Sequence, residues 1–380
     1  MIQERGAAAS LTAALILGLL ASSGCTTDHP PSTRESPRGG GPAVTPAVAA
    51  STRVGVWPSQ DFSGVFAVSA RYVVRPDPRE LRSVVVERRG TGAVVISHQL
   101  PDRRFQTDFA GIHGDKAVLV DEDVRSSDET KVNARGWIYD LTTGHATPVT
   151  DVPGAPPLSR YGPQAAMSTD GKYYYSASVH GGFSNCVGEI DLATMRGRVV
   201  DCASKGGSIL YVNSGDAGAT WTHFTSAGFD GCRVGRGIRM GKSVTIAPDA
   251  CDTFDTATLG ALQLRTTQTP GQPMQPAFPL VATDGTTTTE LGDARGQSLI
   301  VCGGYAYWKR DVGGATPAQD LLRWRPGRPP EVVFHQPEPP SDSTEAVLLT
   351  PKACNDGSVL TVAVTRTTGG SFVATVFSLP

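Results

Sequence analysis

The sequence lacks an excess of charge of either sign. Its 380 residues include 34 Lys and Arg against 36 Asp and Glu, a formal net charge of -2. A nucleic-acid-binding protein needs a concentrated basic surface that displaces counterions from phosphates, so this balance argues against that class. Only 18% of the residues are charged and 39% are hydrophobic, so most of the chain has enough apolar surface to form a core.

Short motifs typical of enzymes and metal sites are also missing. The sequence contains no H-E-x-x-H or C-x-x-C spacing, no G-x-S-x-G elbow, no Walker loop and no dinucleotide fingerprint. None of the seven histidines accompanies such a motif, and we interpret them as surface or hydrogen-bonded structural residues. The sequence therefore indicates no catalytic residue, no metal and no cofactor.

Residues 1–24 are predicted to be an export signal. The apolar run 7–20 has about 14 residues, too short to cross a bilayer core of about 30 Å as a permanent helix. It leads into Leu20-Ala-Ser-Ser-Gly-Cys25, which resembles the lipobox of bacterial lipoproteins, although Ser22 stands where that family prefers Leu. The resemblance implies that Cys25 carries lipid and attaches the protein to the membrane on its extracytoplasmic side. The alternative is an ordinary secretory signal with an incidental cysteine.

Residues 25–52 are predicted to be the lipidated cysteine and a flexible tether. The stretch Thr26–Ser51 contains five prolines, the run Gly39-Gly40-Gly41 and no aromatic residue. Such a composition cannot bury enough apolar surface to offset the entropy of ordering.

Residues 53–380 are predicted to be one all-β domain. Short alternating or β-branched runs recur, separated by Gly, Pro, Asp and Asn, and Gly136–Gly144 resembles the final hairpin of a blade in TolB-like β-propellers. A period of roughly 40 to 55 residues predicts a β-propeller of about seven four-stranded blades, with Arg53–Trp57 as the outer strand of the last blade. The alternative is a pair of β-sandwiches. We place the inner turns near Ala70, Gly114, Asp170, Asp216, Thr256, Gly304 and Asp356.

The six cysteines beyond Cys25 are expected to pair outside the cytoplasm. A hairpin turning near Ala193–Met195 sets Cys186 opposite Cys202, and one turning at Met240–Lys242 sets Cys232 opposite Cys251. The remaining pair, Cys302 and Cys354, lies near the inner turns of blades six and seven and is expected to link them.

The octapeptide Ser214–Trp221 (SGDAGATW) resembles the Asp-box of sialidases and other BNR-repeat propellers, S-x-D-x-G-x-T-W. The resemblance implies a structural hairpin turn, remote from any reaction centre. In such a turn the Asp216 carboxylate accepts backbone N–H groups, Gly218 tolerates positive φ and Trp221 packs on the hairpin. Thr220 supplies the threonine of the motif.

Loops between the second and third strands of a blade are candidates for a binding rim, since they gather at one mouth of a propeller. They include 122–134, Val179–Phe183 and Arg310–Gly314, with His180, Phe183 and Arg310 as candidate contact residues. We therefore expect a monomeric, membrane-anchored module that binds a protein, peptide or glycan without catalysis. The alternative is a propeller enzyme, either a sialidase-like glycoside hydrolase or a lyase.

Overall fold

The computed structural model describes residues 51–379 except for fifteen short stretches: 60–65, 78, 81–82, 102–103, 124–133, 160–163, 180–183, 216, 226–230, 248–249, 270–276, 313–317, 338–345, 350–352 and 367–371. Cys25, the predicted signal and nearly all of the predicted tether lie outside the described residues, as do His180, Phe183 and Asp216.

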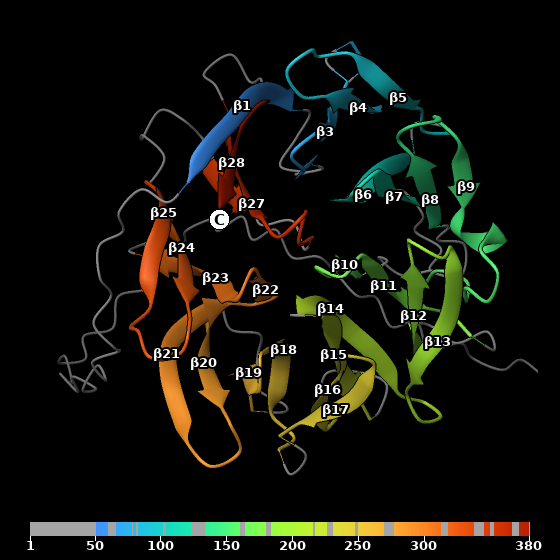
Figure 1. Ribbon diagram of the computed structural model, residues 1–380. Helices are drawn as coiled ribbons and strands as arrows, with labels where there is room; N and C mark the ends of the chain where they lie inside the picture. Colours follow the sequence, from blue (N-terminus) through green and yellow to red (C-terminus); the bar gives the residue numbers. More distant parts are fainter. Residues whose placement is uncertain are drawn as a thin grey trace, which may run out of the picture. The chain divides into compact units, whose positions relative to one another are not determined.

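The predicted β-propeller is confirmed. Seven four-stranded antiparallel sheets follow one another around a ring (Figure 1), and the described residues contain one short 3-10 helix, Val149–Asp151. Within each blade, neighbouring strands along the chain pair with one another. The first strands of successive blades lie against each other, which makes them the innermost strands.

The first four blades hold β2 to β17. Blade 1 contains β2 (Ala67–Val68), β3 (Tyr72–Pro76), β4 (Val84–Arg88) and β5 (Val94–His98). Blade 2 contains β6 (Phe105–His113), β7 (Lys116–Asp123), β8 (Arg135–Asp140) and β9 (Ala146–Pro148). Blade 3 contains β10 (Ala165–Met167), β11 (Lys172–Ala177), β12 (Cys186–Asp191) and β13 (Arg196–Cys202). Blade 4 contains β14 (Ser208–Gly215), β15 (Gly218–Phe224), β16 (Arg233–Arg239) and β17 (Lys242–Ile246).

The last three blades hold the remaining strands. Blade 5 contains β18 (Thr253–Leu259), β19 (Leu262–Thr267), β20 (Ala277–Thr283) and β21 (Thr288–Arg295). Blade 6 contains β22 (Ile300–Cys302), β23 (Tyr305–Val312), β24 (Ala318–Trp324) and β25 (Glu331–Gln336). Blade 7 contains β26 (Ala346–Leu349), β27 (Val359–Arg366), β28 (Phe372–Leu379) and, as its outer strand, β1 (Thr52–Ser59).

The two ends of the described chain close the ring in one sheet. β1 pairs antiparallel with β28 from Thr52 opposite Ser378 to Ser59 opposite Phe372. The predicted outer strand at Arg53–Trp57 is therefore confirmed. Blade 7 depends on segments from both ends of the domain, so the ring cannot close until the whole domain has been made.

The core lies between the blades, because each sheet buries both of its faces. The consecutive tyrosines of β11 show this arrangement. Tyr173 and Tyr175 pack in the cluster between blades 2 and 3, whereas Tyr174 packs in the cluster between blades 3 and 4. A strand that is buried on both faces has a continuous run of apolar residues. The alternation of apolar and polar residues is therefore weak in such strands.

One predicted inner turn is wrong. Thr256 lies in the middle of β18, and the inner turn of blade 5 is at Gly260–Ala261. Every side chain of β18 is buried, and Thr and Ala occupy most of its positions, so the strand lacks the alternation that would have located it. Gly260 adopts a φ of 57°, a left-handed conformation that suits glycine in a tight turn.

A segment of blade 7 crosses the middle of the ring. Residues 353–357, which precede β27, contact blades 2 and 3 as well as the neighbouring blade 6 (Figure 1). Ala353 forms a parallel bridge with Met167 of β10, and the Asn355 side chain accepts a hydrogen bond from the Ile112 amide of β6 at 2.9 Å. Ala353, Cys354 and Asn355 are buried. We call residues 353–357 the central plug.

The expected disulfide bonds are confirmed, and their pairs are Cys186–Cys202, Cys232–Cys251 and Cys302–Cys354. The first joins directly opposed residues of β12 and β13. The second lies outside the hairpin ladder, where the chain leaves β17 and forms a parallel bridge between Arg233 and Asp252. The third joins β22 of blade 6 to the central plug.

Candidate functional site

The strand order defines two faces of the ring. The hairpin turns between first and second strands, such as Gly114–Asp115 and Gly303–Gly304, gather on one face, which we call the turn face. The ends of second strands and the starts of third strands, such as Ala177 and Cys186 or Phe224 and Arg233, gather on the opposite face, the loop face. The central plug lies at the turn face, where Gly114 N–H donates to the Asp356 carboxylate at 3.0 Å. The described contacts of the central plug thus lie at the turn face.

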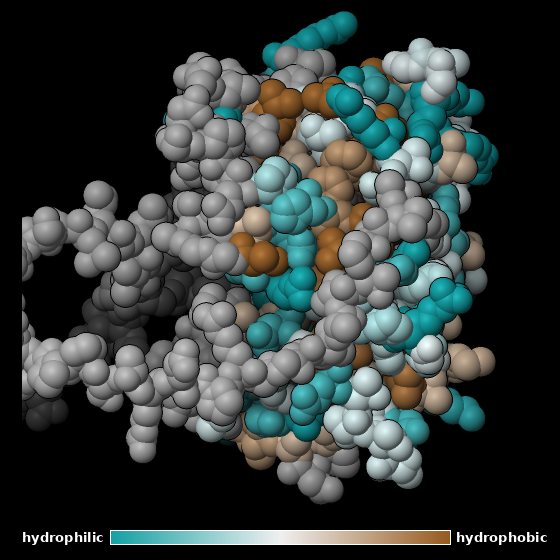
Figure 2. Space-filling view, turned by 90° about the vertical axis from the view of Figure 1, so that its left-hand side faces the viewer, coloured by the Kyte–Doolittle hydropathy of each residue, from teal (hydrophilic) through white to brown (hydrophobic). Residues whose placement is uncertain are grey.

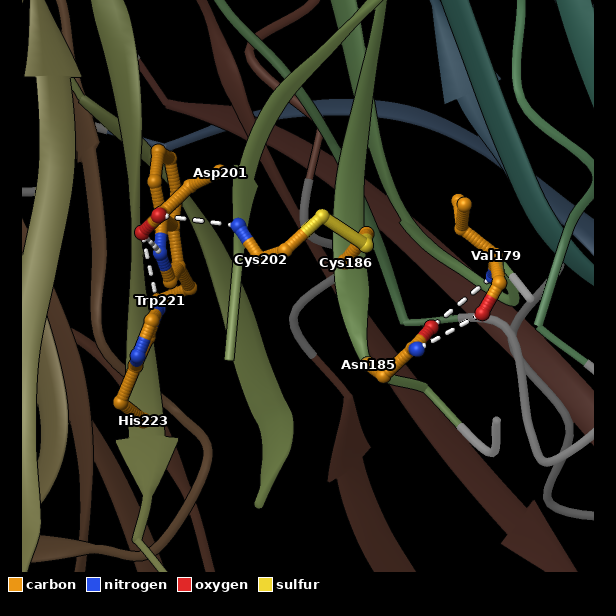
Figure 3. Close-up of a disulfide and its surroundings, with 7 residues drawn as sticks. All are labelled: Val179, Asn185, Cys186, Asp201, Cys202, Trp221 and His223. Carbon is orange, nitrogen blue, oxygen red and sulfur yellow. Dashed lines mark hydrogen bonds and ion pairs between the residues drawn. A yellow bond between two sulfur atoms is a disulfide. The ribbon is translucent and has the colours of Figure 1, made fainter. Parts of the chain in front are cut away.

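A braced loop base stands on the loop face of blade 3 (Figure 3). The Asn185 side chain accepts a hydrogen bond from the Val179 N–H at 2.9 Å and donates one to the Val179 carbonyl at 2.7 Å. Directly after it, Cys186 is joined to Cys202. Ser184, buried in a left-handed conformation, contacts the Ser159 hydroxyl. We call Val179, Ser184, Asn185 and the Cys186–Cys202 disulfide the loop base.

The loop base is tied to the next blade. The carbonyl oxygen of Ser184 accepts a hydrogen bond from the Ile209 N–H of β14 at 2.6 Å. Asp201, the residue before Cys202, accepts hydrogen bonds from the Trp221 indole at 3.0 Å and the His223 imidazole at 2.8 Å, both on β15 (Figure 3). The two ends of connection 180–183 are thus fixed relative to blades 3 and 4.

The electrostatics at Asp201 follow from these contacts. Burial raises the pKa of Asp201, but the hydrogen bond and positive charge of His223, the Trp221 hydrogen bond and the charge of Arg236 together outweigh it and lower the pKa. The carboxylate is therefore ionised and holds the blade 3 and blade 4 junction in one geometry.

The Asp-box residues lie on the innermost pair of strands of blade 4, with the turn between β14 and β15. We expected Gly218 to adopt a positive φ, but the structure shows that it does not. Ala217 does, with a φ of 58°, because it occupies the left-handed position of the turn. Gly218 is needed for another reason: a Cβ there would overlap the Ile238 carbonyl oxygen on the adjacent strand. The role expected of Asp216 lies outside the described residues.

The other Asp-box side chains make contacts between blades. The Ser214 hydroxyl donates to the Val301 carbonyl of blade 6 at 3.2 Å, and the Thr220 hydroxyl donates to the Thr256 carbonyl of blade 5 at 2.6 Å. Trp221 packs in the cluster between blades 3 and 4. These residues therefore join blade 4 to three other blades.

Of the three candidate rim residues, only Arg310 lies in the described part of the chain. It is half-buried on β23, and its guanidinium donates to Asp320 on the adjacent strand β24 at 2.8 Å. Asp320 also contacts His335 at 2.7 Å. Arg310 is thus held in the sheet of blade 6 rather than displayed as a free side chain, which revises the expectation of an exposed residue.

Sequence reasoning missed Asp108, an exposed residue in the bulge of the innermost strand β6. Desolvation raises the pKa of its carboxyl group. Close by, the fully buried Tyr173 has a hydroxyl without a hydrogen-bond partner, and burial raises its pKa well above the usual range. Bulges often place a side chain at a functional position, but they have no local sequence signal.

The described residues contain no group of three or more His, Cys, Asp or Glu side chains able to hold a metal ion. Nor, among those same residues, is any helix long and apolar enough to cross a membrane.

The outer surface shows isolated apolar residues. Figure 2, which views the molecule from the left of Figure 1, shows hydrophilic and hydrophobic residues interspersed. The exposed large apolar side chains of the described residues lie on different elements: Val56, Val94, Val199, Met240 and Val312. Single exposed apolar residues are normal for a soluble surface, so they do not define a docking patch.

Comparison with known proteins identifies no family for this chain and only distant structural similarity. No family model matches the chain. No curated protein matches it either. Among solved structures, the polysaccharide lyase Uly1 is similar with a TM-score of 0.47 and 10% identity, over 84% of this chain and 91% of that one.

Two further solved structures have comparable likeness. The oligogalacturonate lyase of Vibrio parahaemolyticus has a TM-score of 0.41 and 11% identity, over 85% of this chain and 78% of that one. The acylaminoacyl peptidase of Pyrococcus horikoshii has a TM-score of 0.44 and 11% identity, over 83% of this chain but only 49% of that one. At this level the likeness concerns the fold alone.

Proposed function

We propose that this protein is an extracytoplasmic lipoprotein that binds a ligand on the loop face without chemically changing it. The observation that carries the proposal is the loop base, which fixes both ends of connection 180–183 by a disulfide, the Asn185 side chain and contacts to blade 4. Preorganised loops lose less entropy when they bind, so a braced connection suits recognition. The lipobox-like Cys25 supplies the membrane attachment, and the three disulfides suit an oxidising compartment.

The binding proposal is tested with full-length protein on peptide and glycan arrays. We expect His180→Ala and Phe183→Ala to weaken binding, because both belong to the braced connection. Met240→Ala is the control, since Met240 is the most exposed of the large apolar residues and lies in a turn between β16 and β17, away from the loop face. Equal binding by all three variants and the wild type would disprove the loop-face assignment.

The anchor is tested separately by metabolic labelling with an acyl-chain analogue. We expect labelled protein in the membrane fraction and no label in Cys25→Ala. Label that persists in Cys25→Ala would contradict lipidation at this residue.

The second candidate function is a propeller enzyme, a sialidase-like glycoside hydrolase or a lyase. Asp108 favours it, because a carboxyl group with a raised pKa on the innermost strand is suited to act as a general acid. Mass spectrometry of a bound ligand after prolonged incubation separates the two functions. A binding module returns the ligand unchanged, whereas an enzyme yields cleaved or unsaturated products that Asp108→Asn would reduce.

A further inference from the structure

A buried arginine that has no ion pair with any described residue lies on the loop face between blades 4 and 5. Arg233, the first residue of β16, is 1% exposed. Its Nη1 donates to the Gln268 side-chain oxygen at 2.8 Å, and its Nη2 contacts the Gln268 main-chain oxygen. Its Nε is buried with no hydrogen-bond partner. Within the described structure, the guanidinium contacts neutral oxygens and the Phe254 ring, but no carboxylate.

The described residues around Arg233 do not neutralise the positive charge of its guanidinium group. Asp252 is the acid that acts electrostatically on Arg233, but its carboxylate pairs with Arg265 at 2.5 Å. Two guanidinium groups thus lie near one carboxylate, which pairs with only one of them, Arg265. Burial lowers the pKa of Arg233, as expected for a cation withdrawn from water. A buried charge without a counter-ion is costly to a fold, so its presence requires a reason.

The main chain holds this arginine rigidly. Arg233 N–H donates to the Cys251 carbonyl at 3.1 Å, and Gln268 N–H donates to the Asp252 carbonyl at 2.7 Å. The disulfide from Cys232 to Cys251 joins the residues that precede Arg233 and Asp252. The guanidinium therefore cannot easily move to solvent, and an anion must come to it.

We propose that Arg233 binds a carboxylate of an acidic peptide ligand, an inference that rests on the proposed binding function. The two Gln268 oxygens lie on the two terminal nitrogens of the guanidinium as the oxygens of a carboxylate would. Gln268 thereby occupies the edge of the guanidinium formed by Nη1 and Nη2. The unpartnered Nε lies on the adjacent edge, beside Nη2. A ligand carboxylate can bind Nε and Nη2 through parallel hydrogen bonds.

The deep burial of Arg233 favours an acidic peptide over an acidic polysaccharide as the ligand. Arg233 is 1% exposed and Gln268 is 7% exposed. A glutamate side chain carries its carboxylate on a slender two-methylene stem, which suits a guanidinium buried this deeply. A uronic acid carries its carboxylate directly on the much wider sugar ring.

The experiment measures binding of poly-L-glutamate to detergent-solubilised full-length protein by biolayer interferometry, with polygalacturonate and poly-L-lysine as comparison probes. We expect the wild type to bind poly-L-glutamate alone, and Arg233→Met to bind it about tenfold or more weakly. Arg233→Lys should also bind weakly, because an ammonium cannot form two parallel hydrogen bonds. The matched control is Arg75→Met, which removes another buried arginine, one that is paired with Glu87 in blade 1.

Thermal unfolding without any probe gives an independent readout. An arginine kept for ligand binding destabilises the fold, so Arg233→Met should unfold at a temperature at least as high as the wild type. Arg75→Met should unfold at a lower temperature, since it leaves the Glu87 carboxylate unpaired. A lower unfolding temperature for Arg233→Met would overturn the proposal by assigning Arg233 a structural role.

The remaining outcomes separate this inference from the proposed function. Tighter binding of polygalacturonate than of poly-L-glutamate would overturn the peptide assignment. Poly-L-glutamate binding that Arg233→Met leaves unchanged would overturn the Arg233 site. In either case, array binding that depends on His180 and Phe183 would still support the loop-face function, whereas loss of that dependence contradicts the function itself.

Discussion

Two junctions between neighbouring blades each contain a contact between a His and an Asp side chain. The strand that carries the His at one junction carries the Asp at the other. Between blades 1 and 2, His98 on the outer strand contacts Asp121 on the second strand of the next blade at 2.8 Å. Between blades 3 and 4, Asp201 is on the outer strand and His223 on the second strand, also at 2.8 Å. Either order provides one hydrogen bond between neighbouring sheets, so the contact is structural at both places.

Replacement of Asp201 by Asn should lower the stability of the protein in a pH-dependent way. The pKa of Asp201 is lower in the folded state than in the unfolded chain, so the ionised group stabilises the fold above its unfolded value of about 3.9 and loses this effect as the pH falls through the folded value. We expect Asp201→Asn to cost about 1–3 kcal/mol at pH 7, since it removes charge-assisted hydrogen bonds. Urea unfolding at pH 7 and below pH 4 measures the difference.

The matched control is Asp293→Asn, which alters an exposed acid on β21. It should leave stability almost unchanged at both pH values. If Asp201→Asn lowered the free energy of unfolding by the same amount at low pH as at pH 7, the ionised Asp201 carboxylate would not be what stabilises the fold.

Single residues were the part of the site that the sequence predicted least. Cys186 and Cys202 could be paired from the sequence, because their register follows from one local hairpin. Arg233 could not be singled out among the many arginines, because its lack of an ion pair depends on residues brought together from blades 4 and 5. Asp108 was missed since the bulge that exposes it arises from pairing with β7.

At the level of elements, prediction succeeded where turns carry a sequence signal. The turns Asp140–Gly144 and Asp191–Met195 share an Asp side chain that accepts the N–H groups two and three residues later. This pattern can be recognised locally. The Gly260–Ala261 turn carries no such side chain, and the fifth blade was therefore placed with the wrong inner turn. The path of the central plug could not be predicted, since its partners lie on distant blades.

The disulfide that holds the central plug should stabilise the fold most among the three. Its cysteines are 52 residues apart, against 16 for Cys186–Cys202 and 19 for Cys232–Cys251. The chain-entropy relation gives about 4 kcal/mol for the long loop and about 3 kcal/mol for each short one. We expect Cys302→Ala/Cys354→Ala to lower the free energy of unfolding more than Cys186→Ala/Cys202→Ala, as measured by guanidinium denaturation. The reverse order would show that the plug is held by its hydrogen bonds instead.

At the scale of the whole molecule, ring closure and the proposed ligand binding involve different parts of the ring. The central plug closes the turn face by contacts with blades 2, 3 and 6, and β1 closes the circumference at blade 7. The disulfides of blades 3 and 4 lie instead at the loop face. The plug and β1 thus fix the fold at the turn face and along the edge of the ring, away from the loop face to which we assign the proposed binding.

Removal of β1 should open the ring. A chain that begins at residue 51 keeps the pairing of β1 with β28, whereas a chain that begins at residue 60 leaves β28 as an unpaired edge strand. Exposed strand edges recruit other chains, so the shorter form should unfold at a lower temperature and self-associate. Calorimetry and size-exclusion chromatography compare the two. A shorter chain that stays monomeric and unfolds at the same temperature would mean that the remaining three-stranded blade closes the ring by its packing against blades 1 and 6 alone.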